Sequence, residues 1–486
     1  MLPPYLLQKL ETILPKRIFT STDVLQAHTG RFYINKYLPD AVCYAESAED
    51  VIQATNFCIQ HNIPLIPYGS GTSVEGHITA INGGICLNLS KMNKIMEFNP
   101  TDGYVTVQPG ISYNHLNEFL EPHGFHFPVE AGWGASIGGM ASTNASGAGA
   151  TDSGSMAKNV MRCEVVIYRE KQASIIKTGT KSAKSSAGYN LTSLFIGSEG
   201  TLGVITELCL KIRRNFSSYK TICCQFDQIQ QAIDFVVAMK GLIQFRRVEL
   251  LDKLQTEACV AYSNINHLYP NKNTILIELA GNELAIVEEM KLLIDFLNKN
   301  HVENVKTYND KKSAEAIWMM RKNACPAAIQ FIAQNKKPMA TDVSVPISKL
   351  NACIQACYIH MQSMGLRAPL VAHVGDGNFH FTILVNSDDK DELQRAEDFN
   401  RCVVEESLKV EGTCTGEHGI GIGKKPYLES EHGDSLFLMR ALKQSFDPLN
   451  IFNPGKMINI DNQPHLIQDR KPDRDSMSLF SGNKIA

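Results

Sequence analysis

The chain of 486 residues predicts two or three domains, at roughly 100–200 residues per domain. Its 47 Lys and Arg against 50 Asp and Glu give a formal net charge of −3, which excludes the basic field that nucleic-acid binding needs. No apolar stretch reaches the roughly 18 residues that cross a bilayer, and the N-terminus lacks the features of a signal peptide, so we exclude a transmembrane segment and expect a cytoplasmic protein.

The first part of the chain combines short apolar runs with one clear helix signal. A strand is predicted near residues 40–46, and the following helix is capped by Ser47, with Asp50 three residues later. Thirteen cysteines are scattered through the chain without a CxxC pair, and we expect them to be buried, reduced thiols. Further strands, which together indicate an α+β domain, are predicted at 63–67, 84–89 and 104–108.

The segment 132–154 has an unusual composition, since 18 of its 23 residues are Gly, Ala, Ser or Thr. Such small residues allow the backbone to come very close to a flat or anionic group. A flexible linker is the alternative, but Ile137 and Met140 lie within the segment and favour burial. We therefore expect this backbone to contact a ligand.

Two further glycine-rich runs do not match nucleotide-binding templates. In PYGSGTSVEGH (67–77), Val74 stands where a Rossmann fingerprint needs Gly, and GIGIGK (419–424) lacks both that spacing and the phosphate-loop order. Both runs can still cradle an anion with backbone N–H groups. The pentapeptide at 134–138 fits the G-x-S-x-G elbow of serine hydrolases, with Ser136 as nucleophile. Because no convincing strand precedes it, a serine hydrolase stays a distant alternative.

The pattern changes at about residue 217, where a second domain begins. Strands and helices are predicted in the order β-α-β-β-α-β, which is the ferredoxin-like arrangement. A long helix at 313–333 and a strand at 340–345 extend this domain. The polar, aperiodic tail at 461–486 is expected to be disordered. The predicted strands are 219–226, 248–251, 274–280 and 302–308, and the predicted helices end near 240 and 298.

The run 369–385 predicts a β-hairpin, because two apolar segments of β type flank the pair Asp376-Gly377. With this pair as a two-residue turn, His373 and His380 face each other across the strands, with Cβ atoms roughly 5 Å apart. That separation suits two ligands of one cation. A half-buried histidine pair without a metal is the alternative.

A second motif favours the metal site. Glu417 and His418 lie together in the glycine-rich run 412–424, where little side-chain bulk blocks their approach to the hairpin. Two histidines and one carboxylate leave open positions on the metal, as a catalytic ion requires. The additional imidazole of His418 is then available for proton transfer.

Seven blocks of the sequence occur together in an order that matches one known family. The chain resembles the FAD-linked D-2-hydroxy-acid dehydrogenases of the vanillyl-alcohol-oxidase-type flavoprotein superfamily, in particular D-lactate dehydrogenases of the cytochrome-linked type and the flavin subunit of glycolate oxidase. The similarity extends over residues 40–456. The blocks are PYGSGTSVEGH (67–77), GWGASIGGMASTNASG (132–147), SSAGYNLTSLFIGSEGTLGVITE (185–207), DVSVPIS (342–348), HVGDGNFH (373–380), GTCTGEHGIG (412–421) and DPLNIFNPGK (447–456).

The resemblance implies an α+β, two-domain FAD-binding fold of the PCMH type, with a ferredoxin-like cap domain. It predicts an FAD-binding domain at 1–215, a substrate or cap domain with the metal site at 216–430, and a C-terminal segment at 431–460 that returns to the FAD domain. Noncovalent FAD is expected, because Val74 and Glu75 occupy the core of the first loop, where relatives with covalent flavin often carry a histidine. The family's FAD contacts correspond to Pro67, Gly69, Ser70, Gly71, Thr72, Ser73, Gly138, Gly139, Ser142, Thr143, Ser146, Gly147, Glu199, Gly200, Gly203, Val204 and Ile205.

The resemblance also implies the roles of the reactive residues. His373, His380 and Glu417 correspond to the ligands of a divalent metal, Zn or Mn, and His418 corresponds to the base. Arg321 matches the arginine that pairs with the substrate carboxylate, for which a bidentate guanidinium is well suited. The metal would act as a Lewis acid on the substrate hydroxyl while the flavin takes the electrons.

The implied activity is oxidation of a small D-2-hydroxy acid, with D-lactate expected. Relatives that act on dicarboxylic hydroxy acids carry an Asn where Thr382 stands and a basic residue near 340–341, so a monocarboxylate is favoured. A glycolate oxidase flavin subunit and a D-2-hydroxyglutarate dehydrogenase are the alternatives. Expected partners are a quinone, a cytochrome or an electron-transfer protein as electron acceptor, with peripheral contact with the inner membrane and a homodimer as further options.

Overall fold

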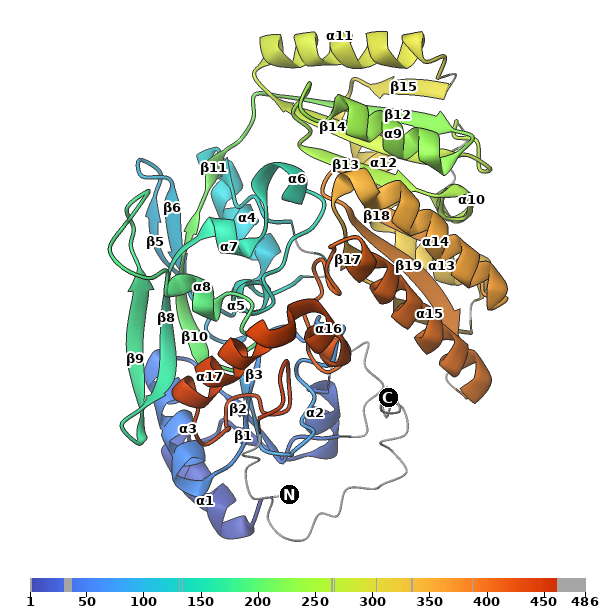
Figure 1. Cartoon of the computed structure of the whole chain (residues 1–486). Coiled ribbons are helices and arrows are strands. Elements are labelled where there is room, and N and C mark those ends of the chain that lie inside the picture. Colours follow the sequence, from blue (N-terminus) through green and yellow to red (C-terminus); the bar gives the residue numbers. More distant parts are fainter. Residues whose placement is uncertain are drawn as a thin grey trace.

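The computed structural model of the chain describes residues 2–29, 37–130, 132, 134–263, 265, 267–302, 304–333, 335–386 and 388–460 (Figure 1). The tail at 461–486, for which we predict disorder, lies outside these residues. All thirteen cysteines are free thiols, and eleven of them are buried. None of the helices in the described part of the chain combines the length and the apolar composition needed to cross a membrane.

The chain begins with a small sheet and its covering helices. These elements are α1 (Pro4–Ile13), β1 (Ile18–Phe19), α2 (Thr22–Ala27), β2 (Ala41–Tyr44), α3 (Ala48–His61), β3 (Leu65–Tyr68) and β4 (Ile85–Asn88). The strand order is β1-β2-β4-β3, with β2 and β3 parallel to β4. α3 begins as predicted, because Ser47 and Asp50 form a capping box in which each side chain accepts the other's backbone N–H.

A second, antiparallel sheet completes the N-terminal half, in the order β5-β6-β10-β8-β9. The predicted strands at 40–46, 63–67, 84–89 and 104–108 are all confirmed. Short helices from the small-residue segment pack against the sheet over a buried apolar core. The elements are β5 (Ile95–Asn99), β6 (Tyr104–Val107), α4 (Tyr113–Leu120), β7 (Phe125–His126), α5 (Ile137–Ser142), α6 (Ala150–Ser153), α7 (Met156–Asn159), β8 (Val160–Arg169), β9 (Gln172–Gly179), α8 (Thr192–Phe195), β10 (Val204–Lys211) and β11 (Arg213–Arg214).

The second half is built on one large sheet in the order β15-β12-β14-β13-β18-β19-β16, with β17 also paired to β19. The order β15-β12-β14-β13 is the ferredoxin-like order that the sequence predicts. A helix that the sequence analysis missed, α10 (Lys253–Ser263), lies between β13 and β14. The other elements are β12 (Ser218–Phe226), α9 (Ile229–Met239), β13 (Arg247–Leu251), β14 (Asn273–Gly281), α11 (Glu283–Lys299), β15 (Asn304–Tyr308), β16 (Lys337–Ala340), β17 (Val343–Ser344), β18 (Leu370–His373) and β19 (Asn378–Val385).

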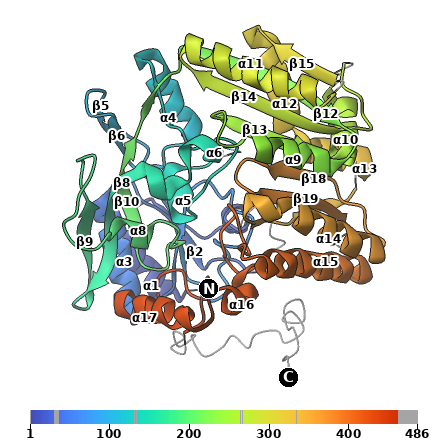
Figure 2. The same ribbon diagram turned by 45° about the horizontal axis from the view of Figure 1, so that its top comes forward.

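Helices cover both faces of this sheet (Figures 1 and 2). One apolar cluster joins the sheet to α9, α11, α14 (Leu350–Ser363) and α15 (Lys390–Lys409). A separate cluster on the opposite face joins it to α10, α12 (Lys311–Lys322) and α13 (Ala324–Ile332). The long helix predicted at 313–333 is therefore wrong, since it is two helices divided at Asn323. The reason is Pro326, which has no N–H and whose ring would clash with the carbonyl of Lys322 in a continuous helix.

The strand predicted at 340–345 is likewise divided, into β16 and β17, which both pair with β19. The two residues between them, Thr341 and Asp342, are fully buried and turn toward the interior of the molecule.

The last described helix and the residues after it pack against the N-terminal half. α17 (Leu436–Phe446), which follows α16 (Leu428–His432), lies beside the elements of the N-terminal half in both views (Figures 1 and 2). Leu65 donates its N–H to the carbonyl of Ile451 at 2.7 Å, and Asn453 donates its N–H back to Leu65 at 2.8 Å. The Lys443 ammonium also binds the carbonyl of Thr201 at 2.8 Å. Residues 443–453 thus pack against the N-terminal half.

Candidate active site

One cavity of about 3490 Å³ lies between the N-terminal half and the large sheet. Its lining includes all seventeen residues predicted to contact FAD, together with Arg321, His373, His380, Glu417 and His418. The sequence-predicted site residues, which are up to 351 positions apart in the chain, are therefore brought together around one space.

The first glycine-rich loop follows β3 and approaches the start of α5. Gly71 has a φ of +69°, a conformation that side chains disfavour, and a Cβ at Gly69 would lie 2.2 Å from the hydroxyl of Ser136. Ser136 donates its backbone N–H to the Ser70 hydroxyl at 3.1 Å. The buried hydroxyl of Ser73 has no protein hydrogen-bond partner, as expected for a group that faces an anionic ligand.

Ser136 itself has a structural role in this loop. Its side chain accepts the N–H of Gly139 at 3.3 Å and thereby caps α5. The residue is 3% exposed. A capping hydroxyl in this position explains the Ser in the G-x-S-x-G pentapeptide without hydrolase chemistry.

Glu199 contacts the cavity but uses its carboxylate elsewhere. It has a φ of +54°, and its two carboxylate oxygens accept the N–H groups of Ile420 at 2.6 Å and Gly421 at 2.8 Å. The imidazole of His77 lies 3.3 Å from the same carboxylate. Glu199 therefore fastens the second glycine-rich run to the N-terminal half, and only its backbone is available to a cofactor.

The predicted hairpin forms with a different register. His373 pairs with Asn378 and Val371 pairs with His380, so His373 and His380 are diagonal neighbours instead of direct partners. The turn is longer than two residues because Asp376 donates its N–H to the carbonyl of His373 at 3.1 Å, and its carboxylate accepts the N–H of Asn378 at 3.2 Å. A shift of two residues keeps both histidines on one face, and their ring centroids are 5.7 Å apart.

Three groups converge above this hairpin as potential metal ligands. His373 Nε2 lies 3.6 Å from one oxygen of the Glu417 carboxylate, and His380 Nε2 lies 3.2 Å from the other. One potential ligand atom from each of the three residues lies within 4.8 Å of the other two. The Nδ1 atoms point away, since His373 Nδ1 lies 2.6 Å from Glu249 and His380 Nδ1 lies 2.9 Å from the carbonyl of Thr341. Both Nε2 atoms therefore face the same point.

The electrostatics of this group fit a cation. Although burial alone would raise the pKa of Glu417, the adjacent His373 and His380 hold it well below the usual value. Burial would lower the pKa of His373, but Glu249 and Glu417 raise it well above 6.5. His380 Nε2 is buried without a hydrogen-bond partner. Two imidazole nitrogens and a carboxylate in this arrangement are a donor set that Zn or Mn accepts.

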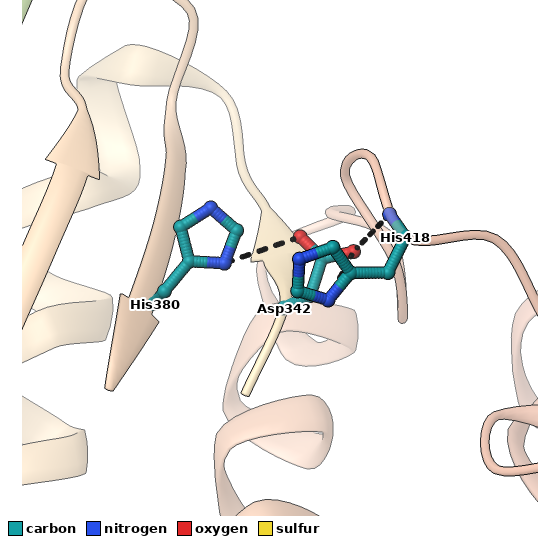
Figure 3. Close-up of side chains that lie close together, drawn as sticks. All are labelled: Asp342, His380 and His418. Atoms are coloured by element: carbon teal, nitrogen blue, oxygen red, sulfur yellow. Dashed lines mark hydrogen bonds and ion pairs between the residues drawn. The ribbon is translucent and has the colours of Figure 1, made fainter. Parts of the chain in front are cut away.

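A second set of three potential ligands, Asp342, His380 and His418, shares one histidine with the first (Figure 3). Both carboxylate oxygens of Asp342 already accept hydrogen bonds from the protein. Its Oδ2 accepts the N–H groups of Gly416, Glu417 and His418 at 2.9, 3.0 and 2.9 Å, and its Oδ1 accepts the Asn378 amide at 2.8 Å. With its lone pairs used in this way, Asp342 holds the 416–418 backbone in place and is a poor metal ligand.

His418 lies next to the three convergent ligands with a less constrained ring. The ring stacks on His380 with centroids 5.1 Å apart, and its Nε2 is 3.7 Å from the Glu417 carboxylate. Its Nδ1 is buried without a hydrogen-bond partner, 4.0 Å from Glu75 and 3.9 Å from Asp342. Because Nδ1 is buried, Nε2, which lies on the side of Glu417, is the nitrogen suited to exchange a proton with a bound molecule.

Arg321 projects from α12 toward the same sheet face. Its Nε and Nη2 atoms contact one oxygen of Glu249, at 2.8 and 2.5 Å. The guanidinium is 17% exposed and lines the cavity, so it keeps donors for an anion. Arg321 and His373 thus share one buried carboxylate.

Sequence reasoning missed Glu249, Asp342 and Glu75 as members of the site. Glu249 was visible as a single carboxylate in the apolar strand Arg247–Leu251, a position where an unpaired charge would be costly. Asp342 lies within a quoted block, but nothing in its local pattern indicates that it binds a loop more than 70 residues downstream. Glu75 stands in the first glycine-rich loop, and its carboxylate lies near His418.

Two known protein families match the two halves of the chain. The FAD binding domain family matches residues 39–173, and the family "FAD linked oxidases, C-terminal domain" matches residues 217–457. The mitochondrial D-lactate dehydrogenase [cytochrome] of Arabidopsis thaliana is 36% identical over 94% of this chain and 80% of its own length. The glycolate oxidase subunit GlcD of Bacillus subtilis is 31% identical over 89% of this chain and 92% of its own length.

Among solved structures, p-cresol methylhydroxylase with bound substrate superposes with a TM-score of 0.74 at 16% identity, over 94% of this chain and 97% of that one. This similarity shows the fold, which is the PCMH-type two-domain architecture that the sequence predicts. The sequence matches lead to one conclusion. The chain belongs to the family of FAD-linked oxidases that includes D-lactate dehydrogenases and glycolate oxidase GlcD subunits.

Proposed function

We propose that the protein oxidises D-lactate to the 2-oxo acid with noncovalent FAD and a divalent metal held by His373, His380 and Glu417. The observation that carries this proposal is the convergence of these three ligands, His418 and Arg321 on the cavity lined by the flavin loops. The cytochrome-linked D-lactate dehydrogenase among the relatives supports the choice of substrate.

The residues present fit FAD. The glycine-rich loop 69–73 and the start of α5 offer backbone N–H groups and the unpaired Ser73 hydroxyl to a pyrophosphate. Val74 and Glu75 offer no histidine for a covalent bond to the flavin, and His77, two positions later, is held by Glu199. The proposed FAD-binding domain is 1–215, with the cap domain at 216–430 and the returning segment at 431–460.

The chain's own groups would divide the work of oxidation. Arg321 binds the substrate carboxylate through its free guanidinium donors, which fixes the orientation of C2. His418 accepts the hydroxyl proton at Nε2, the ring nitrogen that lies beside Glu417. A metal held by His373, His380 and Glu417 would supply Lewis acidity toward the hydroxyl, and FAD held by the glycine-rich loops would supply the two-electron acceptor.

Glycolate is the second candidate substrate, because the GlcD subunit is among the relatives. A dicarboxylic substrate is less well supported. Thr382 and Ala340 are cross-strand partners that line the cavity, and neither provides a charge for a second carboxylate.

The decisive experiment is anaerobic mixing of the yellow holoenzyme with D-lactate, L-lactate, glycolate and D-2-hydroxyglutarate, with flavin bleaching as the readout. D-lactate should reduce the flavin fastest. Faster reduction by glycolate would transfer the assignment to the second candidate. Heat or acid should release free FAD, and flavin that stays with the denatured chain would contradict noncovalent binding.

The electron acceptor stays a prediction, and the cytochrome named for the plant relative supports that class. Cytoplasmic localisation, peripheral contact with the inner membrane and a homodimer also stay predictions. Reoxidation of the substrate-reduced enzyme by a cytochrome, a quinone or an electron-transfer flavoprotein would distinguish the acceptors.

A further inference from the structure

The carboxylate of Glu249 joins two functional groups that come from different elements. Glu249 lies on β13 with 0% exposure, and its neighbours Val248 and Leu250 point into the apolar cluster on the other face. Its Oε1 contacts His373 Nδ1 at 2.6 Å on β18, and its Oε2 contacts Arg321 Nε at 2.8 Å on α12. Its partner Arg321 is permanently charged, so the buried carboxylate is the anion of this ion pair.

The donors and acceptors in this chain of contacts allow one arrangement. An ionised carboxylate only accepts hydrogen bonds and a guanidinium only donates them. The Nδ1 atom of His373 must therefore carry the proton that it donates to Glu249. In a neutral imidazole this leaves the lone pair on Nε2, the atom that faces Glu417 at 3.6 Å. Carboxylates commonly fix metal-binding histidines in this way.

We propose that Glu249 is a positioning residue that couples the anion-binding Arg321 to the metal-binding His373. Because both partners end on one buried carboxylate, neither can shift without the other. The proposal rests on the proposed function, since it assumes that His373 binds a metal and that Arg321 binds a carboxylate.

A glutamine at this position cannot serve both partners. Its amide has one oxygen and one NH₂ group, whereas Arg321 and His373 Nδ1 both need an acceptor. Arg321 is permanently charged and brings two donors, so it retains the amide oxygen. The NH₂ group then faces His373 and requires Nδ1 to accept. That forces the proton onto Nε2 and blocks this atom as a ligand.

The test is a metal titration of FAD-loaded protein after removal of bound metal with a chelator, with Mn²⁺ and Zn²⁺ as probes. Glu249→Gln should weaken the affinity by about 10–100-fold, the usual cost of losing such a partner. FAD content and melting temperature report whether the variant is folded. Wild-type metal affinity in a folded Glu249→Gln protein would overturn the proposal.

A double-mutant cycle separates the coupling from simple loss of a negative charge. In an Arg321→Met background the new amide oxygen is free to accept from His373, so Glu249→Gln should then cost less than about threefold in metal affinity. If only the negative charge mattered, Glu249→Gln would weaken metal affinity by the same factor with Arg321 present and with Arg321→Met. Equal losses of metal affinity would therefore overturn the proposal. Glu278→Gln is the matched control, because Glu278 is a buried carboxylate on β14 whose ion pairs in the described structure are with Arg246 and Arg247 and not with His373. It should leave metal affinity unchanged.

A wild-type protein that takes up neither ion would refute the metal in the proposed function without deciding the role of Glu249. The role would then be judged on anion binding to the metal-free flavoprotein, with oxalate as probe and the flavin spectrum as readout. Glu249→Gln should weaken oxalate binding by about tenfold, since a guanidinium anchored to an amide is held less firmly than one anchored to a carboxylate. Unchanged oxalate affinity would overturn the inference.

Discussion

At the scale of single residues, the chemistry of the site depends on which imidazole nitrogens are free. His373 and His380 each use Nδ1 for a protein contact, so their Nε2 atoms are directed toward Glu417. His418 differs, because its Nδ1 has no hydrogen-bond partner and its ring is held mainly by stacking on His380. His373 and His380 are therefore fixed with Nε2 toward one point, as the proposed metal requires, and the ring of His418 is less constrained, as the proposed base requires.

His418→Asn should slow anaerobic flavin reduction by D-lactate by roughly 10²–10⁴-fold, the usual cost of losing a positioned acid-base group. FAD and metal content should stay at wild-type levels, because Glu417 and the hairpin histidines are unchanged. Stopped-flow measurement of flavin absorbance gives the rate, and its substrate dependence gives the affinity, which should change much less. His360→Asn on α14 is the control, since His360 pairs with Glu406 outside the cavity lining. Wild-type reduction in His418→Asn would place the base elsewhere.

At the scale of elements, a single buried aspartate fixes the loop that carries Glu417 and His418. Asp342, between β16 and β17, accepts the Thr415 hydroxyl at 2.6 Å in addition to three backbone N–H groups. A carboxylate with this many donors acts as a template for the backbone around it. The position of this backbone therefore determines where the side chains of Glu417 and His418 lie.

Asp342→Asn should disorder this loop, because an amide nitrogen would replace one acceptor oxygen among converging donors. We expect a loss of metal affinity of at least the roughly 10–100-fold seen when metal-site partners are lost, with FAD retained. Metal content and flavin content of the purified variant measure the two effects. Thr415→Val, which removes one of the four donors to Oδ2, should cost much less. Equal effects of the two substitutions would contradict the template role.

The hairpin turn makes a second prediction at this scale. Gly377 has a φ of +85°, and a Cβ there would lie 2.0 Å from the carbonyl oxygen of Val345. Gly377→Ala should destabilise the protein by more than the roughly 1 kcal/mol that left-handed backbone alone costs. Gly365→Ala is the matched control, because Gly365 has a φ of +63° with open space around its Cβ position. Denaturant unfolding measures the free energy of unfolding that each variant loses. A larger loss in Gly377→Ala reports the clash with Val345, and equal losses would show that the turn can move to avoid it.

At the scale of the whole molecule, the two halves and the C-terminal segment form one body. Arg246 on the sheet side contacts Glu130 of the N-terminal half at 2.5 Å. After the large sheet the chain runs back to the N-terminal half. Lys443 and Lys456 are buried where α17 and the residues after it meet that half. Lys443 is paired with Asp447, whereas Lys456 donates, among the residues that the structure describes, to the carbonyl of Pro454 alone.

Burial and the nearby Lys425 lower the pKa of Lys456 to about 7 from its ordinary 10.5. Between pH 7 and pH 10.5, Lys456 is protonated in the unfolded chain but has lost its proton in the folded protein. The contribution of Lys456 to the free energy of unfolding therefore rises with pH across this window. Lys456→Met should therefore stabilise the protein most near pH 7, and the gain should shrink toward pH 10 by up to about 1.4 kcal/mol per pH unit. Denaturant unfolding from pH 7 to pH 10 tests this. A flat difference would contradict it, and Lys291→Met, on an exposed part of α11, should show no trend.

The sequence alone determined what depends on near neighbours in the chain. The capping box at Ser47 and Asp50, most of the succession of strands and helices in the second half, and the hairpin with two histidines on one face all follow from local sequence patterns. Seven motif blocks in order were sufficient to indicate the family. Side chains of a strand alternate between its two faces, so a shift of two residues in the strand pairing leaves each side chain on the same face. The shared face of His373 and His380 was therefore predictable from the sequence, but their pairing register was not.

Only the tertiary structure decided which distant groups meet. Glu249 and His373 are 124 positions apart, and Asp342 reaches a loop 74 positions downstream. Local pattern cannot place such pairs, because the contact depends on how β13, β18 and α12 pack on one sheet face. The carbonyl of Gly375 in the hairpin turn is likewise bound from a distance, by the Lys240 ammonium at 2.8 Å, although the Asp376 turn itself is local. Secondary structure is a local free-energy balance, whereas a site is assembled by long-range packing.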